Sequence, residues 1–142
     1  MVGGQMMDML APDESFDSNA VMLLQRLKTG ALFEFACEAG AILGEAGAEA
    51  RAVMRDYARD FGLTFQITDD LIDTVSSAGA AGKSVGKDEA QGKATLVSIY
   101  GIEGARGKAA ELAQRAAARL EGFGAAADLL RALPYRLLDR DR

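Results

Sequence analysis

Histidine and tryptophan are absent from the 142-residue chain, and cysteine occurs once, as Cys37. The lack of histidine excludes Ser-His-Asp and Cys-His catalysis, imidazole ligation of a metal and a histidine pH switch. A single cysteine excludes an intrachain disulfide framework. The chemistry of this chain must therefore come from carboxylates, lysines, arginines and hydroxyl groups.

Proline is scarce as well, with two residues, and aromatic residues make up only 6% of the chain. Apolar residues make up 49%, and alanine, leucine and methionine are abundant among them. A shortage of β-branched and aromatic residues disfavours strands, whereas alanine, leucine and methionine favour helices. The composition predicts a single all-α domain, because a chain of this length has no room for two domains of ordinary size.

A large excess of either charge is also missing, since 16 basic and 21 acidic residues give a net charge of −5. A nucleic-acid partner is therefore not expected. No uncharged apolar run reaches about 18 residues, so no membrane span is expected. The first ten residues have neither the basic start nor the apolar stretch of a signal peptide, and we expect a cytoplasmic protein.

Periodic apolar positions predict a succession of helices. The first is short and ends before Pro12. The second is capped by Asp17 or Ser18 and is interrupted at Gly30. It then resumes until Gly44 and Gly47 end it.

Further helices are expected at residues 49–75, 95–100, 103–120 and 129–136, with an irregular stretch at 77–92. Gly62 lies inside the longest of them, where glycine is unfavourable by about 1 kcal/mol relative to alanine. Pro134 is expected to kink or split the last helix.

An acidic segment within the long helix is the strongest candidate for chemistry. Asp69 and Asp73 lie four residues apart on one helical face, Asp70 lies about 100° away, and Gln66 lies about one turn earlier. Neighbouring carboxylates repel one another unless a cation lies between them, and hard oxygen ligands suit Mg²⁺. The alternative is a solvated acidic face, although the interleaved apolar residues indicate a buried helix.

A glycine-punctuated segment, residues 82–95, carries Lys83, Lys87 and Lys93. Lysine is a point-charge partner for phosphate, and glycine lets the backbone approach a ligand closely. An ordinary surface loop is the alternative interpretation. The segment is not a Walker phosphate loop, because the GxxxxGK[ST] pattern and a preceding strand are lacking.

Two weaker features come earlier in the chain. Lys28 and Thr29 precede Gly30 at the expected helix interruption, where backbone groups are available to bind a phosphate. Gln5 and Asp8 lie about one turn apart on the first helix. Either feature alone is more often structural than functional.

In their order along the chain, these segments resemble the C-terminal half of trans-isoprenyl diphosphate synthases of the farnesyl and geranyl diphosphate synthase type. The resemblance covers residues 4–140 and rests on GGQMMDM, LQRLKTGALFEFACEAGAILG, YARDFGLTFQITDDLIDT, GKSVGKDEAQGKATLVSIYGIEGAR and RALPYRLLDR. The succession of KTG, FQxxDDxxD and GKxxGKDxxxGKAT is specific, whereas each motif alone is not. The resemblance implies an all-α helical bundle, the C-terminal half of the isoprenoid synthase fold.

The resemblance also implies roles for individual residues. It matches three aspartates to the family's second aspartate-rich motif, which holds Mg²⁺ against an allylic diphosphate: Asp69, Asp70 and Asp73. Three lysines match residues that contact this diphosphate or follow the motif: Lys28, Lys83 and Lys93.

Other matches concern the surroundings of the reaction. Thr29 matches a residue that faces the forming carbocation, and Gln66 matches a glutamine on the same cavity wall. Gln5 and Asp8 match the family's GQxxD element, and Asp88 matches an acidic residue near the metals. Lys87 stands where the family has a small or hydroxyl residue, and it receives no role.

The implied activity is prenyl transfer, the Mg²⁺-dependent condensation of an allylic diphosphate with isopentenyl diphosphate. The family's first aspartate-rich motif, with the arginines that bind isopentenyl diphosphate, has no counterpart here, and Met1 falls where the family has an internal methionine. We therefore expect residues 1–142 to be the C-terminal part of a polyprenyl synthase domain, a fragment that starts inside a helix and is inactive alone.

The expected partner is a second copy of the chain or the missing N-terminal half, because a divided cavity leaves apolar helix faces exposed. Two alternatives stay open. One is a non-catalytic helical subunit or fragment that only associates with partners, and the other is an unrelated acidic helical interaction domain.

Overall fold

The computed structural model describes residues 1–10, 16–80 and 95–140. Within these ranges every regular element is a helix, which confirms the predicted all-α class. None of these helices combines the length and the apolar character that crossing a membrane requires.

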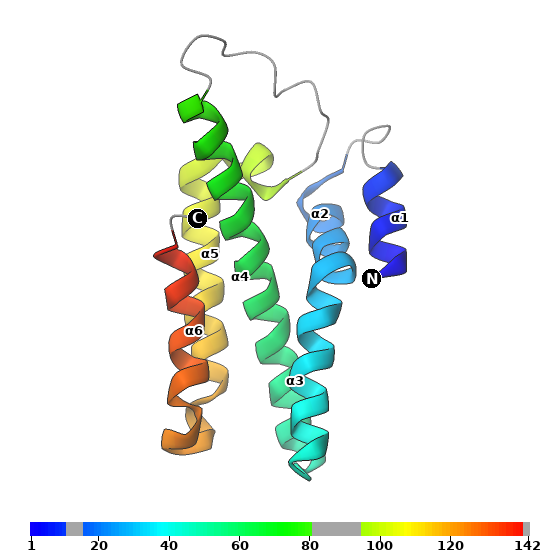
Figure 1. The fold of residues 1–142 in the computed structure, drawn as a ribbon, viewed down its shortest axis with the longest axis vertical. Coiled ribbons are helices and arrows are strands. Elements are labelled where there is room, and N and C mark those ends of the chain that lie inside the picture. Colours follow the sequence, from blue (N-terminus) through cyan, green and yellow to red (C-terminus); the bar gives the residue numbers. More distant parts are fainter. Residues whose placement is uncertain (11–15, 81–94, 141–142) are drawn as a thin grey trace.

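Long antiparallel helices form the body of the bundle (Figure 1). One segment consists of α2 (Ser18–Gln25), a π-helical turn η2 (Arg26–Gly30) and α3 (Ala31–Leu43). The next is α4 (Ala48–Ala80), which packs against α3 on one side and against α5 (Leu96–Arg119) on the other. A 3-10 turn η4 (Glu121–Ala127) leads to α6 (Asp128–Leu138), which contacts α5 and α4, while α1 (Val2–Leu10) lies beside η2 and α2.

The main core lies between α4 and α5. Ile67 and Leu71 of α4 are buried against the apolar face of α5. That face recurs every three or four positions and confirms the predicted amphipathic helix, with Ala105, Ala109, Leu112 and Ala116 buried. Alanine at most of these positions lets the two helices approach closely.

A group of aromatic rings joins α3 to α4. The Phe33 ring lies against both Phe61 and Phe65, with ring centroids 5.1 and 5.4 Å apart. Tyr57 lies one turn before Phe61 on α4 and stacks on it, with ring centroids 5.8 Å apart. These contacts fix α3 and η2 against the half of α4 that leads into the acidic segment.

One helix boundary differs from the prediction and another confirms it. The long helix continues through Ala80, so residues 77–80 are helical and not part of an irregular stretch. The helices expected at 95–100 and 103–120 are confirmed as two helical pieces of α5, because Gly101 between them has non-helical backbone angles, with φ of 69° and ψ of 173°. Glycine adopts this left-handed conformation without the steric cost of a side chain, so the chain changes direction within a single residue.

The glycines at the ends of α3 also behave differently from expectation. Gly30 does not interrupt the helix, because its φ of −58° and ψ of −35° are helical and the chain widens into a π turn there. At the other end, Glu45 and not a glycine takes the left-handed conformation, with φ of 55°. The Ala46 amide donates to the Ala41 carbonyl and the Glu45 amide to the Ile42 carbonyl, which is the Schellman arrangement.

Pro134 does not split the last helix, since α6 continues on both sides of it. Proline has no amide hydrogen, so the carbonyl of Leu130, four residues earlier, lacks its helical donor. The hydroxyl of Tyr57 donates to this carbonyl instead, at 2.8 Å. A tertiary hydrogen bond thus satisfies the carbonyl that proline leaves without its helical donor.

Candidate functional site

The acidic segment lies on the C-terminal half of α4, as predicted. Asp69 and Asp70 are half-buried, and Asp73 is exposed. The helical spacing places Gln66, Asp69 and Asp73 within about 60° of one another around the axis, with Asp70 at the edge of the same face.

A chain of hydrogen bonds connects η2 to this face. The Thr29 hydroxyl donates to Gln66 Oε1 at 3.1 Å, and Gln66 Nε2 donates to Asp70 Oδ1 at 3.1 Å. Thr29 lies 37 positions before Gln66, so the tertiary fold makes this contact. Because Gln66 accepts through Oε1 and donates through Nε2, its side-chain amide has one defined orientation. It thereby fixes one oxygen of the Asp70 carboxylate relative to η2.

Two glycines explain how η2 approaches α4 so closely. A Cβ atom added to Gly62 would lie 3.3 Å from the Gly30 Cα and 3.0 Å from the Phe33 ring. Gly62 lies one turn before Gln66 on α4, and Gly30 directly follows Thr29. The helix-weakening glycine inside α4 therefore permits the backbone contact that brings Thr29 to Gln66.

Lys28 is held from the other side, by α1. Its Nζ lies 2.5 Å from Asp8 Oδ2, and the two side chains are 35% and 24% exposed. A Cβ atom at Gly4 would overlap the backbone of Leu27 and Lys28, so only glycine allows α1 to lie this close. Gln5 lies on the same helix and is exposed.

The structure adds Arg140 to the site, a residue that sequence reasoning did not select. Its guanidinium forms an ion pair with Asp69 at 2.5 Å and lies over the Phe65 ring, 5.2 Å from the centroid. The two charged residues are 71 positions apart and lie on α4 and at the end of α6. No local pattern signals such a contact, although RLLDR was part of the family resemblance.

Three predicted residues, Lys83, Asp88 and Lys93, lie outside the described residues. The expected approach of Lys83 to Lys28 therefore stays a prediction. Cys37 is half-buried, and burial raises the pKa of its thiol, so a nucleophilic thiolate is disfavoured there.

The carboxylates fit a metal shared with a second ligand better than a closed metal cage. In the described part of the chain, no three Asp, Glu, His or Cys side chains converge on one point. Three aspartates on a single helix project at different angles and approach a metal from one side only. Mg²⁺ commonly binds through one or two carboxylates, water and phosphate oxygens, which is the coordination that such a one-sided set allows.

The comparisons with known proteins agree with this geometry. The sequence model of a family described as polyprenyl synthetase matches residues 1–132. The chain is 34% identical over 129 residues to a farnesyl diphosphate synthase of Geobacillus stearothermophilus, covering 89% of this chain and 43% of that protein. It is 36% identical over 126 residues to a chloroplastic geranylfarnesyl diphosphate synthase of Leucosceptrum canum, covering 87% of this chain and 35% of that protein.

Solved structures of similar proteins share the fold of this chain. An FPP/GFPP synthase from Zymomonas mobilis superposes with a TM-score of 0.79 at 44% identity, covering 96% of this chain and 45% of that one. A putative farnesyl-diphosphate synthase from Marinomonas sp. MED121 gives 0.79 at 28% identity, with 98% and 46% covered. The chain thus spans less than half the length of the relatives that it matches.

Proposed function

The chain belongs to the polyprenyl synthetase family, and on that premise we propose that residues 1–142 supply the C-terminal part of a prenyltransferase active site. The proposed reaction condenses an allylic diphosphate with isopentenyl diphosphate. The site residues are those of the KTG segment, the acidic face of α4 and the lysines that follow it.

The observation that supports this function most directly is the contact between Thr29, Gln66 and Asp70. It joins two of the motifs that carry the family resemblance into one polar surface. A solvated acidic face has no need of such a contact, whereas a site that must hold a carboxylate in one orientation requires it.

In the proposed reaction, the C–O bond of the allylic diphosphate breaks and its electron pair leaves with the diphosphate. A magnesium ion bound through Asp69, Asp70 and Asp73 would supply positive charge to the leaving group. Lys28 adds a further charge when it exchanges Asp8 for a phosphate oxygen. The double bond of isopentenyl diphosphate then attacks the allylic carbocation, and a proton is lost.

The remaining residues orient the reacting groups and set the electrostatic environment of the carbocation and the diphosphate. Thr29 and Gln66 place oxygen dipoles beside the carbocation, and Gln66 also orients Asp70. We assign Lys83 and Lys93 to the diphosphate, and Gln5, Asp8 and Asp88 to the surroundings of the metal and the cavity. The aromatic rings of α3 and α4 contribute apolar walls that keep water from the cation.

Under this proposal residues 1–142 supply only part of the active site, because the matched relatives are more than twice as long. The surface of the chain is consistent with association: Leu32 is 54%, Phe35 is 70% and Leu43 is 85% exposed on α3. Apolar side chains grouped in this way mark interaction surfaces. We propose that residues 1–142 bind magnesium diphosphate alone and support turnover only when the rest of a synthase domain, from the same or another chain, completes the cavity.

A non-catalytic associating subunit is the second candidate, favoured by the ion pair between Arg140 and Asp69. In this function Arg140 neutralises the carboxylate permanently, and no metal replaces it. The two candidates differ in whether the acidic face binds magnesium diphosphate.

Calorimetric titration of the chain with pyrophosphate, with and without Mg²⁺, tests the proposal. We expect binding that requires Mg²⁺ and that Asp69→Asn abolishes. The matched control is Glu121→Gln, which removes the same charge from an exposed position in η4. Binding that is unchanged by Asp69→Asn, or absent in the unmodified chain, contradicts the proposal and supports the non-catalytic alternative.

A second experiment tests the need for a partner. Product formation from allylic and isopentenyl diphosphates is measured for the chain alone and after mixing with the N-terminal part of the Zymomonas mobilis FPP/GFPP synthase that lies outside the match. Product is expected only in the mixture. Turnover by the chain alone would contradict the proposed need for the missing part.

A further inference from the structure

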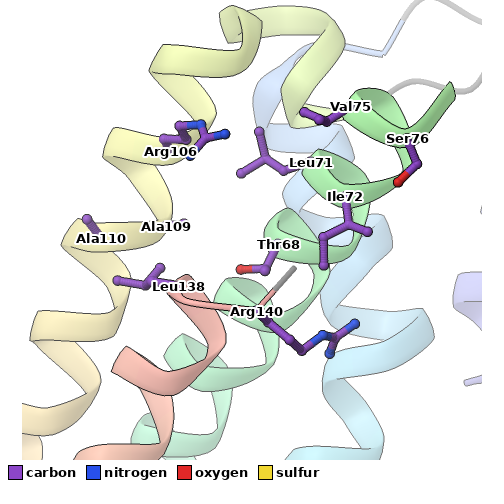
Figure 2. A pocket seen from close by; sticks show the side chains of 10 residues that line it. All are labelled: Thr68, Leu71, Ile72, Val75, Ser76, Arg106, Ala109, Ala110, Leu138 and Arg140. Carbon is purple, nitrogen blue, oxygen red and sulfur yellow. The ribbon is translucent and has the colours of Figure 1, made fainter. Parts of the chain in front are cut away.

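The side of α4 that faces α5 and α6 is not the side that meets η2. Figure 2 shows the α5 and α6 side, where a cavity of about 310 Å³ is lined by α4 residues that include Thr68 and Leu71. Gln66 and Asp70 project from a different side of the helix. The contacts that hold η2 beside Gln66 must therefore come from elsewhere, and a group of ion pairs provides one of them.

Glu34 of α3 joins η2 to α4 through the two oxygens of its carboxylate. Its Oε1 accepts from Arg26 Nε at 3.2 Å, and its Oε2 accepts from Arg59 Nε at 2.9 Å. Arg26 is the first residue of η2, and Arg59 belongs to α4. The Glu34 side chain is only 18% exposed, so water screens its charge less than that of a fully exposed carboxylate. We refer to these three residues as the ion-pair clamp.

The α4 end of the ion-pair clamp is itself anchored on α5. Arg59 Nη1 donates to Asp56 Oδ1 at 2.9 Å, and Arg119 Nη1 of α5 donates to Asp56 Oδ2 at 3.3 Å. Arg119 Nε also binds the buried Asp60, at 2.6 Å. Ion pairs therefore run without a break from η2 across α3 and α4 to α5, and they give Glu34 a fixed support.

The pair of Arg26 with Glu34 spans the π turn. The Ala31 amide donates to the Arg26 carbonyl five residues earlier, which is the π-helical hydrogen bond. A turn of this kind contains one residue more than an α-helical turn. It therefore changes the angular position of the residues before it by about 100° relative to those after it.

The directions of two site residues depend on this turn. Lys28 and Thr29 both belong to η2, where Lys28 pairs with Asp8 of α1 and Thr29 donates to Gln66 of α4. If η2 relaxed to an α-helical turn, both side chains would rotate relative to α3. A rotation of about 100° would break at least one of the two contacts. A contact that stabilises the π turn therefore positions both residues.

From these features we infer that Glu34 is a positioning residue, which stabilises the π turn and thereby directs Lys28 and Thr29. It acts through Arg26 and Arg59 and does not itself touch a ligand. The effect of Glu34 on diphosphate binding rests on the proposed function, whereas its effect on the π turn does not.

Glu38 provides a matched control one turn further along α3. It accepts from two arginines of α4, Arg51 Nη2 at 3.2 Å and Arg55 Nη1 at 2.7 Å, and neither of them belongs to η2. Glu34→Gln and Glu38→Gln thus remove the same charge and the same number of ion pairs. Both variants should shift the midpoint of urea denaturation by similar amounts, but only Glu34→Gln should affect η2.

Hydrogen exchange without any ligand tests the effect on the π turn. In Glu34→Gln, the Ala31 amide should exchange about threefold or more faster than in the unmodified chain, after correction for the loss of global stability. In Glu38→Gln, the corrected rate should not change. An unchanged rate in Glu34→Gln, or the same acceleration in both variants, would overturn the inference.

Calorimetric titration with magnesium pyrophosphate tests the effect on the site. Glu34→Gln should weaken binding about two- to fivefold, and Glu38→Gln should not. Charge repulsion alone predicts the opposite for Glu34→Gln, because removing a carboxylate favours an anion. The double variant Arg26→Gln/Glu34→Gln loses one charge of each sign, so simple charge effects would cancel in it. If Glu34 acts by position, the double variant should bind as weakly as Glu34→Gln.

The two measurements separate this inference from the proposed function. If the unmodified chain does not bind magnesium pyrophosphate, the proposed function fails, and exchange of the Ala31 amide still decides whether Glu34 stabilises the π turn. If the chain binds the ligand and Glu34→Gln binds it equally or more tightly, Glu34 is not a positioning residue and the inference is wrong.

Discussion

Tyr57 on α4 donates a hydrogen bond to the carbonyl oxygen of Leu130 in α6, the group whose helical donor is missing because residue 134 is proline. Tyr57 is almost fully buried, and burial raises the pKa of its phenol well above the ordinary value. The phenol therefore keeps its proton, and remains a donor, to higher pH than an exposed tyrosine would.

Replacing Tyr57 by phenylalanine should lower the free energy of unfolding by about 1–3 kcal/mol, because the Leu130 carbonyl is left without a partner. The midpoint of urea denaturation measures this loss. Pro134→Ala in the Tyr57→Phe background should restore part of it by supplying a backbone N–H. Tyr135→Phe, at an exposed position, serves as the control and should change little.

Gly4→Ala should detach α1 from η2, since the added methyl group has no space against the backbone of Leu27 and Lys28. Hydrogen exchange of the amides in Val2–Leu10 should become at least tenfold faster. The neighbouring Gly3→Ala has open space around its Cβ and should stabilise α1 slightly. Equal effects of the two substitutions would show that the close approach does not matter.

Glu45→Gly should stabilise the chain by about 1 kcal/mol, because the position is left-handed, with φ of 55°, and glycine adopts this conformation without strain. Thermal denaturation detects the change. Gly44→Ala tests whether residue 45 and not residue 44 is the left-handed position. Because φ is −82° at Gly44, alanine should be tolerated there. A destabilised Glu45→Gly variant would mean that the glutamate side chain contributes more than the strain costs.

Asp60→Asn should cost about 2–4 kcal/mol. Asp60 is 4% exposed and binds Arg115 and Arg119, which come from the next helix. Without the negative charge, two neighbouring guanidinium groups lose their buried carboxylate partner and keep only more exposed pairs with Glu111 and Asp56. Asp56→Asn, at a 43% exposed side chain in the same network, should cost less than 1 kcal/mol in the same urea titration.

Arg140→Gln should raise the affinity for Mg²⁺ in the presence of pyrophosphate by about three- to tenfold, because it frees Asp69 from its ion pair. Titration calorimetry measures the affinity, and Arg136→Gln controls for the lost charge. If Arg140→Gln weakens binding instead, the arginine contributes to the diphosphate site more than it competes for the carboxylate.

The periodicity of the sequence was sufficient to predict the helices, because each amphipathic face repeats within a few residues. The helix cap at Asp17 and the buried face of α5 could be predicted in this way, because both depend on residues that are close in the sequence. The length of α4 was predicted too short, since the glycine-rich composition after Val75 was interpreted as a helix end. In the structure, α4 continues to Ala80.

Contacts between distant segments could not be predicted from local pattern. The hydrogen bonds from Thr29 to Asp70 depend on Gly30 meeting Gly62. From the sequence, Gly30 was interpreted as a helix interruption that could bind phosphate and Gly62 as a helix-weakening residue, and it was not predicted that the two would meet. The pair of Arg140 with Asp69 spans 71 positions and depends on how α6 returns along α4. The candidate residues were thus predicted by type and spacing, whereas their mutual arrangement came from tertiary packing.

The alanine-rich contact between α4 and α5 has a consequence for how stability varies with temperature. Alanine has no rotamers to lose on folding, so this contact forms at little cost in side-chain entropy. It also buries less apolar area per residue than leucine or isoleucine would. Because the heat capacity of unfolding follows the apolar area exposed, it should fall below the usual value of about 12–15 cal/mol/K per residue. The stability curve of this bundle should therefore be flatter than usual, with a smaller loss of stability on cooling.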